Sequence, residues 1–194
     1  MSQGTECSTR CCARDLAQAG LPTVTLTRLV SAGKLERVGR GVYSRPNQAI
    51  SENRSLAEVA IRVPRGVICL ISALRVHDIG TQAPHEIWLA IPHHMLSPRI
   101  SQPALRVIRM SGPSLTEGID RVKVDGVEVA VFNVAKTIAD CFKFRNKIGL
   151  DVALEALREG WNKRKVAMDD LWRYAAVNRV AIVMRPYLES IAAS

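Results

Sequence analysis

The side chains best suited to chemistry lie between residues 23 and 45, where a short helical pattern precedes a glycine-rich basic segment. Leu26, Leu29 and Val30 recur at helical spacing and define one apolar face, so the opposite face of this helix is available to a ligand. Arginine can donate two hydrogen bonds to guanine, and threonine or valine methyl groups can contact thymine in the major groove. The residues expected to read DNA bases are Val24, Thr25, Thr27, Arg28 and Ser31.

A basic hairpin is expected directly after this helix. Two short β-type runs, residues 35–38 and 42–45, flank a Gly-Arg-Gly sequence whose glycines permit a tight turn. Cations on such a hairpin can bind phosphate groups, which holds DNA without reading its sequence. A basic hairpin alone is more typical of a solvated surface, but the helix, stop and hairpin in this order favour a winged helix-turn-helix. The expected phosphate contacts are Lys34, Arg37, Arg40 and Arg45.

Two helices must position the base-reading side chains. The second helix of the motif would begin at Thr23, a good N-cap residue, and would end at Gly33. The first helix is predicted over residues 12–19, where apolar side chains gather on one side before Gly20. Residues 1–11 show no periodicity and are expected to form a frayed tail.

The segment GLPTVTLTRLVSAGKLERVGRGVY resembles the N-terminal winged helix of the AbiEi antitoxin family, the transcription regulators of type IV toxin-antitoxin and abortive-infection systems. The later series ISALRVHDIG, EIWLAIP, VDGVEVAVFNVAKTIADCF and GLDVALEALREG is similar in order and spacing to the C-terminal domain of that family. The resemblance implies two activities. The first domain would bind inverted repeats upstream of its own operon and repress it, and the second would counteract a nucleotidyltransferase-type toxin.

The start of the chain departs from the family pattern, in which another helix usually precedes the winged helix. Three explanations remain open. The start is truncated, the C-terminal domain covers the gap, or residues 5–14 form one longer helix.

The remainder of the chain predicts a small β-sheet covered by helices. Asp125-Gly126 lies between two alternating apolar runs and indicates a hairpin with a type I′ turn. Ser72 and Asn133 are expected to cap helices, and Pro186 is expected to interrupt the last one. Strands are predicted over residues 66–71, 86–91, 104–110 and 121–132, and helices over 55–63, 72–80, 134–144, 149–160, 166–177 and 180–191.

The fold expected from these patterns is a mixed α/β (α+β) protein of 194 residues. We place a winged helix-turn-helix DNA-binding domain at residues 1–46 and an AbiEi-like antitoxin domain at 47–194. The chain has a net charge of +9, and residues 1–46 contain seven Lys and Arg against three Asp and Glu, a net charge of +4. This charge favours double-stranded DNA as the partner. No membrane span or signal peptide is evident, so we expect a cytoplasmic protein.

Metal and enzyme chemistry are not expected. His93 and His94 lie in a proline-rich loop where adjacent side chains point in different directions, and the N-terminal cysteines lack the spacing of a zinc site. Cys69 and Cys141 fall in apolar surroundings typical of buried thiols. No nucleophile, metalloprotease or phosphate-loop motif is present, so we expect no cofactor. All five cysteines, Cys7, Cys11, Cys12, Cys69 and Cys141, are expected to be free thiols.

A second basic cluster follows Trp161. A solvated loop is one interpretation of this cluster, and a basic face that assists DNA contact or toxin antagonism is the other. Its candidate residues are Arg158, Lys163, Arg164, Lys165 and Arg173. Two alternatives to an antitoxin also remain at this point. The chain could be an orphan winged-helix transcription factor, or a protein-interaction module without DNA binding.

Overall fold

The computed structural model describes residues 10–12, 28–32, 36–39, 42–44 and 52–193. Helices and strands are mixed along the chain, which confirms the predicted α/β class. The chain divides into two compact units, Met1–Arg62 with Lys123–Glu128, and Val63–Val122 with Val129–Ser194. The domain boundary predicted after residue 46 lies outside the described residues.

The first unit contains a three-stranded antiparallel sheet in the order β1-β3-β2. The predicted hairpin is present, because β2 pairs with β3 and places Arg37 opposite Tyr43, with an irregularity before Gly39. Residues 28–31 are helical, and the amide of Ala32 donates to the Arg28 carbonyl at 2.9 Å. The strands are β1 Arg10–Cys12, β2 Glu36–Gly39 and β3 Val42–Ser44.

Strand β1 corrects the prediction for the start of the chain. Residues 10 and 11 were expected in a frayed tail and Cys12 at the start of a helix, but all three pair with β3. This also excludes a single helix over residues 5–14. Residues 10–12 form a strand because β3 pairs with β2 along only one of its edges. The backbone groups on its other edge also require hydrogen-bond partners, which a local sequence pattern does not show. The rest of the predicted first helix, residues 13–19, lies outside the described residues.

The helix predicted over residues 55–63 is present as α3, Glu52–Arg62, which begins three residues earlier and ends one residue earlier. Leu56, Ala57 and Val59 are buried, which gives the helix one apolar face. On its other side Glu58 and Arg62 form an ion pair at 2.7 Å, one helical turn apart.

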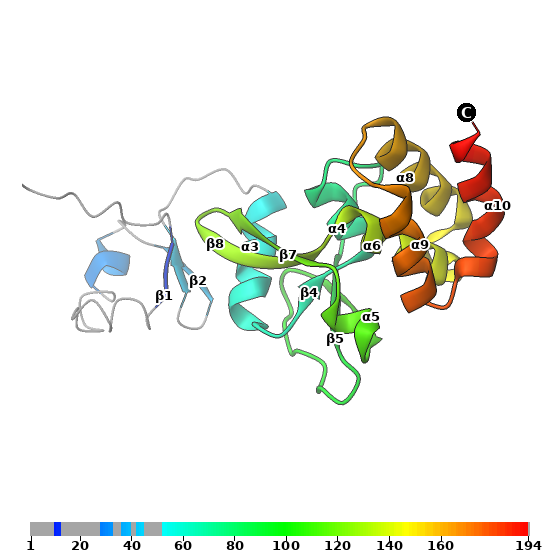
Figure 1. The fold of residues 1–194 in the computed structure, drawn as a ribbon. Coiled ribbons are helices and arrows are strands. Elements are labelled where there is room, and N and C mark those ends of the chain that lie inside the picture. Colours follow the sequence, from blue (N-terminus) through cyan, green and yellow to red (C-terminus); the bar gives the residue numbers. More distant parts are fainter. Residues whose placement is uncertain (1–9, 13–27, 33–35, 40–41, 45–51, 194) are drawn as a thin grey trace, which may run out of the picture. The chain divides into compact units, whose positions relative to one another are not determined.

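A five-stranded mixed sheet has the order β6-β5-β4-β8-β7 (Figure 1). Strand β5 pairs parallel to β6 and antiparallel to β4, and β4 pairs parallel to β8. Asp125 and Gly126 both have positive φ, 49° and 80°, which agrees with the predicted type I′ turn. The strands are β4 Val67–Ile68, β5 Ile87–Pro92, β6 Leu105–Met110, β7 Ile119–Val124 and β8 Val127–Phe132.

The predicted strand over residues 66–71 is shorter than expected, because α4 already begins at Leu70. Ser72 therefore does not cap this helix. It lies buried within α4, and its hydroxyl accepts a hydrogen bond from the amide of Trp88 at 3.0 Å. The run from Gly66 to Ile71 is apolar throughout, and such a run does not distinguish a buried strand from a buried helix start.

Helix α6 lies at the centre of the helical layer and contacts α4, α8, α9 and α10 (Figure 1). Asn133 caps it as predicted, accepting from the amide of Lys136 at 2.8 Å. Pro186 was expected to interrupt the last helix, but α10 continues through it while Met184 and Leu188 remain fully buried. The helices are α4 Leu70–Val76, α5 Pro113–Thr116, α6 Val134–Lys143, α7 Arg145–Ile148, α8 Leu150–Asn162, α9 Met168–Val177 and α10 Ala181–Ala192.

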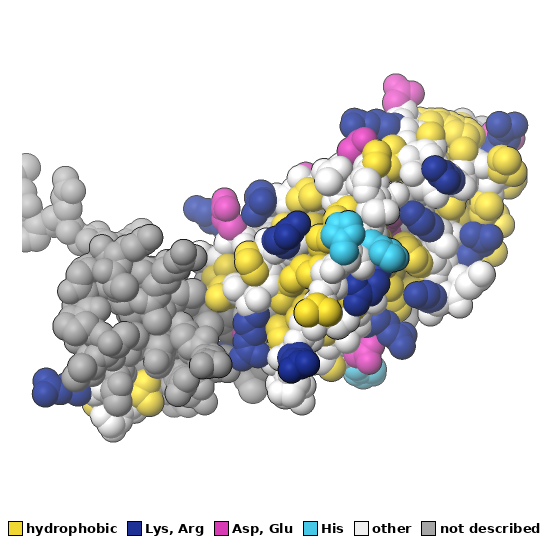
Figure 2. Space-filling model, turned by 90° about the horizontal axis from the view of Figure 1, so that it is seen from below, with side chains coloured by type: hydrophobic (Ala, Val, Ile, Leu, Met, Phe, Trp, Pro, Cys, Tyr) yellow, Lys and Arg dark blue, Asp and Glu magenta, His cyan; other side chains and the backbone are white. Residues whose placement is uncertain are grey.

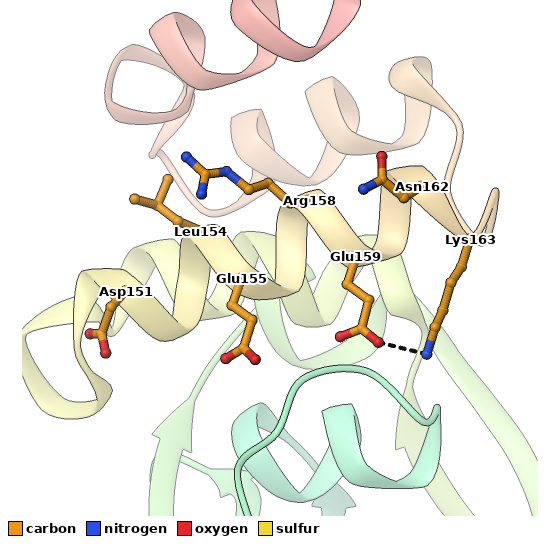
Figure 3. A pocket seen from close by; sticks show the side chains of 7 residues that line it. All are labelled: Asp151, Leu154, Glu155, Arg158, Glu159, Asn162 and Lys163. Carbon is orange, nitrogen blue, oxygen red and sulfur yellow. Dashed lines mark ion pairs between the residues drawn. The ribbon is translucent and has the colours of Figure 1, made fainter. Parts of the chain in front are cut away.

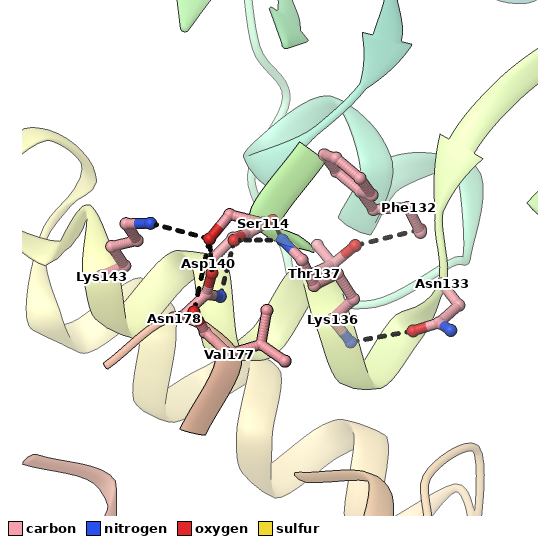
Figure 4. Close-up of polar contacts among 9 residues, drawn as sticks. All are labelled: Ser114, Phe132, Asn133, Lys136, Thr137, Asp140, Lys143, Val177 and Asn178. Carbon is pink, nitrogen blue, oxygen red and sulfur yellow. Dashed lines mark hydrogen bonds and ion pairs between the residues drawn. The ribbon is translucent and has the colours of Figure 1, made fainter. Parts of the chain in front are cut away.

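A buried ion pair lies within α6 (Figure 4). The side chains of Lys136 and Asp140 have no exposed surface, and Lys136 Nζ lies 2.6 Å from both carboxylate oxygens of Asp140. Asn178, which follows α9, donates to the same carboxylate at 2.7 Å. Burial raises the pKa of Asp140, while Lys136 and Asn178 act against this shift. Lys136 and Asn178 thus favour the charged form of Asp140, whereas burial opposes it.

The network continues to α5. Ser114 Oγ donates to the amide oxygen of Asn178 at 3.1 Å, and Lys143 Nζ donates to Ser114 Oγ at 3.2 Å. Burial, with the neighbouring cations, lowers the pKa of Lys143. The polar network therefore connects α5, α6 and the turn after α9 inside an otherwise apolar core.

Replacement of Lys136 by methionine should lower the free energy of unfolding by about 3 to 5 kcal/mol, because it leaves the Asp140 carboxylate buried without its cation. The double variant Lys136→Met/Asp140→Asn removes both charges and keeps an acceptor for Asn178. It should recover most of this loss in urea unfolding. A double variant as unstable as the single one would contradict this assignment.

Candidate nucleic-acid interface

In the helix expected to read bases, the described residues 28–31 lie with their apolar side chains less exposed than their polar ones. Leu29 and Val30 are half-buried, whereas Arg28 and Ser31 are exposed. The Ser31 hydroxyl donates to the carbonyl of Arg28 at 3.1 Å, which holds it against the backbone of its own turn. Val24, Thr25 and Thr27, the other expected base contacts, lie outside the described residues.

Of the four residues expected to hold phosphates, Arg37 lies on a described strand, β2. Pairing of β2 with β3 gives this position a rigid antiparallel frame. Lys34, Arg40 and Arg45 lie outside the described residues. The structure therefore provides the frame of the hairpin, and the phosphate contacts remain an expectation from the sequence.

The second basic cluster surrounds the end of α8, and two of its lysines contact a distant loop. Lys163 Nζ donates to the carbonyl of Asp78 at 2.8 Å and pairs with Glu159 at 2.6 Å (Figure 3). Lys165 Nζ donates to the carbonyl of His77. These ammonium groups are therefore hydrogen-bonded within the protein, so they are less available to an external phosphate.

Acidic side chains on α8 bind the amides of the same loop. Glu159 accepts from the amide of Gly80, and Glu155 accepts from the amide and hydroxyl of Thr81 at 3.1 and 2.9 Å. Carboxylates thus bind the N–H groups of the loop while lysines bind its carbonyls. The sequence shows these residues only as a charged helix face, because their partners lie more than 70 residues away.

The other three members of the second basic cluster point in different directions. Arg173 on α9 pairs with Glu117 at 3.0 Å. Arg158 lines the same pocket as Glu159 and Lys163, but its side chain is directed away from theirs (Figure 3). Arg164 lies in the turn beyond the helix. Figure 2 shows basic side chains spread over the face in view rather than gathered in one patch. Three of the five residues, Lys163, Lys165 and Arg173, are therefore bound by groups of the protein itself.

The histidine loop after β5 is held by an arginine. Arg109 donates to the carbonyls of His93 and Met95 at 2.9 and 2.6 Å, while His93 and His94 are exposed. His77 instead hydrogen-bonds the carbonyl of Phe132 at 2.7 Å through Nε2. Among the described residues, no group of three or more potential ligands could hold a metal ion.

The two cysteines whose side chains are described, Cys69 and Cys141, are free and fully buried. Burial raises the pKa of both thiols, and the nearby Asp140 carboxylate raises it further. They therefore remain protonated at neutral pH and lack the thiolate needed for nucleophilic attack. No helix in the described part of the chain is long and apolar enough to cross a membrane.

The amide signal of Gly80 should titrate with a midpoint below the ordinary glutamate pKa of 4.5, because Lys163 and the Gly80 amide lower the pKa of Glu159. A carboxyl group whose pKa is lower in the folded state stabilises the fold at pH values above its ordinary pKa. This stabilisation is lost as the pH falls through the lowered pKa. The measurement is an NMR pH titration. Lys163→Met should raise the midpoint, and a wild-type midpoint at or above 4.5 would refute the contact.

The N-terminal segment is similar to a known protein family, and the fold is similar to a solved structure. Residues 13–46 match the family described as transcriptional regulator, AbiEi antitoxin. The crystal structure of the RV2827C protein from Mycobacterium tuberculosis is similar, with a TM-score of 0.55 and 14% sequence identity. The likeness covers 87% of this chain and 66% of that one, slightly less than two thirds of its length. At this identity it concerns the fold alone.

No curated protein sequence matches the chain. The matched segment spans the expected helix-turn-helix and contains both strands of the β2–β3 hairpin. The resemblance drawn from the GLPTVTLTRLVSAGKLERVGRGVY motif is thereby confirmed, and it places residues 13–46 of the chain among sequences similar to the AbiEi antitoxin transcriptional regulators.

Proposed function

We propose that the chain binds inverted repeats in its own operator through an N-terminal winged helix-turn-helix, and that it represses its operon in the cytoplasm. The observation that carries this proposal is the family match over residues 13–46, which contains the exposed Arg28 and Ser31 and the paired β2–β3 hairpin. The excess of cations in this part of the chain supports an anionic partner.

The two parts of the motif would contribute differently to DNA affinity. Arg28, with Ser31 and the residues just before them, would distinguish base pairs through hydrogen bonds and methyl contacts in the major groove. The hairpin cations would neutralise phosphates and release counterions, which makes the affinity depend on salt but not on sequence. Specificity and overall affinity should therefore be separable by mutation.

The second part of the proposal is that the chain is the antitoxin of a type IV pair and counteracts a nucleotidyltransferase-like toxin encoded beside it. The antitoxin description of the matched family supports this assignment. Within the second basic cluster, Arg158 and Arg164 are the members we assign to an external contact. Lys163, Lys165 and Arg173 instead bind groups of the protein itself.

The experiment that tests the DNA proposal is binding of the purified chain to a labelled fragment of its own upstream region at several salt concentrations. Selective retention of this fragment over an unrelated one, with affinity falling steeply as salt rises, is the expected result. Equal or absent binding to both fragments would refute sequence-specific repression and favour a protein-interaction module.

The antitoxin proposal is tested separately. A neighbouring nucleotidyltransferase-like reading frame should be toxic when expressed alone, and co-expression of this chain should restore growth. If growth is not restored while operator binding is intact, the chain is a transcription factor without antitoxin activity.

Arg28→Ala should weaken binding to the operator by about 1 to 3 kcal/mol and should relax the preference for one base pair, because it removes a base contact. The measurement is competition between the operator and variants with single base-pair changes. Arg173→Ala is the control of equal charge change, since Arg173 pairs with Glu117. Unchanged base preference in Arg28→Ala would show that this residue reads no base.

Arg40→Ala should weaken binding to the operator and to unrelated DNA about equally, because a phosphate contact carries no sequence information. The slope of log affinity against log salt should decrease in magnitude by about one. Fluorescence anisotropy over a range of salt concentrations gives both quantities. An unchanged slope would remove Arg40 from the phosphate contacts.

A further inference from the structure

The turn that ends α8 places an arginine where glycine is usually found. Lys165 N donates to the carbonyl of Gly160 and Arg164 N to that of Trp161, both at 2.9 Å. These two bonds form a Schellman motif, whose residue beyond the cap adopts the left-handed conformation that glycine adopts most easily. Arg164 occupies that position with a φ of 53°. A cation near a helix C-terminus offsets part of the strain, but it does not specify where the guanidinium points.

The side chains of residues 161–165 lie on two sides of this turn. Lys163 and Lys165 contact the loop at His77 and Asp78. Trp161, Asn162 and Arg164 instead line an open depression of about 480 Å³, together with Val166. This volume lies within the range of pockets that bind small molecules.

The groups that line this depression have no partners of their own in the described part of the chain. No hydrogen bond or ion pair there involves the indole N–H of Trp161, the side-chain amide of Asn162 or the guanidinium of Arg164. Trp161 is half-buried, so one part of the indole is fixed and another is available to a ligand. The neighbouring lysines, by contrast, are hydrogen-bonded to the protein.

The three groups match the parts of a nucleotide. An indole offers a flat surface on which a base can stack. A primary amide can donate to and accept from one edge of a base, as asparagine does with adenine. A guanidinium can bind a phosphate through two parallel hydrogen bonds. Arg158 on the adjoining face of α8 adds positive charge beside Asn162.

We propose that Trp161, Asn162 and Arg164 form a binding site for one unpaired nucleotide unit. The base stacks on Trp161, Asn162 contacts the edge of the base, and Arg164 holds the phosphate. This site goes beyond duplex recognition by the N-terminal segment, because both faces of a base in an undistorted duplex are already stacked on neighbouring bases. The nucleotide is either free or part of a single strand, and the test below distinguishes the two.

The test follows the indole N–H signal of Trp161 by NMR while adenosine monophosphate is added to the full chain, with Trp161→Phe used to assign the signal. The signal should shift progressively with the nucleotide. Adenosine and inorganic phosphate, which each lack one half of the ligand, should bind at least about tenfold more weakly. No shift at millimolar nucleotide would overturn the proposal if a single-stranded oligodeoxyadenylate also fails to shift the signal.

Arg164→Gly removes the guanidinium, and the relief of the left-handed conformation should offset the loss of the cation at the helix C-terminus. It should weaken nucleotide binding about tenfold, at an unchanged or higher melting temperature, and should leave adenosine binding unaffected. The matched control is Arg179→Gly, since Arg179 occupies the equivalent position after α9 with a φ of 57°. If both variants lost nucleotide affinity equally, the loss would be due to the change in net charge, and the proposed site would be wrong.

The oligodeoxyadenylate identifies the source of the nucleotide. Tighter binding of the oligomer than of the mononucleotide, detected through the same indole signal, would assign the site to a single strand. Binding of the mononucleotide alone would assign it to a free nucleotide. Either result supports the site, and both are independent of operator binding, which is measured on duplex DNA.

Discussion

The buried ion pair within α6 is the interaction on which the helical part of the structure depends. Lys136 and Asp140 have no contact with solvent, so each charge must be neutralised by groups that the fold supplies. Lys136 and Asp140 lie one turn apart on α6 and therefore meet in any orientation of the helix, but their contact with Asn178 requires that α6 turn this face toward the end of α9. Because Asn178 follows α9 and binds Ser114 near α5, the pair also sets the position of these elements. The apolar core packs around this arrangement rather than determining it alone.

With α6 fixed, the neighbouring helices end at defined places on the surface. Helices α8 and α9 both end in a hydrogen-bonded turn with a left-handed arginine, Arg164 and Arg179. At the end of α8 this turn separates the lysines that bind the loop at residues 77–78 from the side chains that line the depression. A flexible loop of the same composition would not keep the two sets apart.

The family match and the likeness of fold cover different shares of the chain. The family match covers only residues 13–46, whereas the likeness to a solved structure covers 87% of the chain at 14% identity. Surface residues of a DNA-reading segment must keep particular chemical groups, so its sequence stays recognisable. A core requires only apolar side chains of suitable volume and pattern, so the fold persists when the sequence does not.

The sequence by itself determined the mixed α/β class, the β2–β3 hairpin, the turn at Asp125-Gly126 and the cap at Asn133. Each of these depends on residues within a few positions of one another. Only the tertiary structure decided that Arg10–Cys12 pairs with β3, that Ser72 binds Trp88, and that two lysines of the second basic cluster bind a loop while Arg164 lines a depression. The partners of Lys163 lie up to 85 residues away, and local patterns carry no information about groups that only packing brings together.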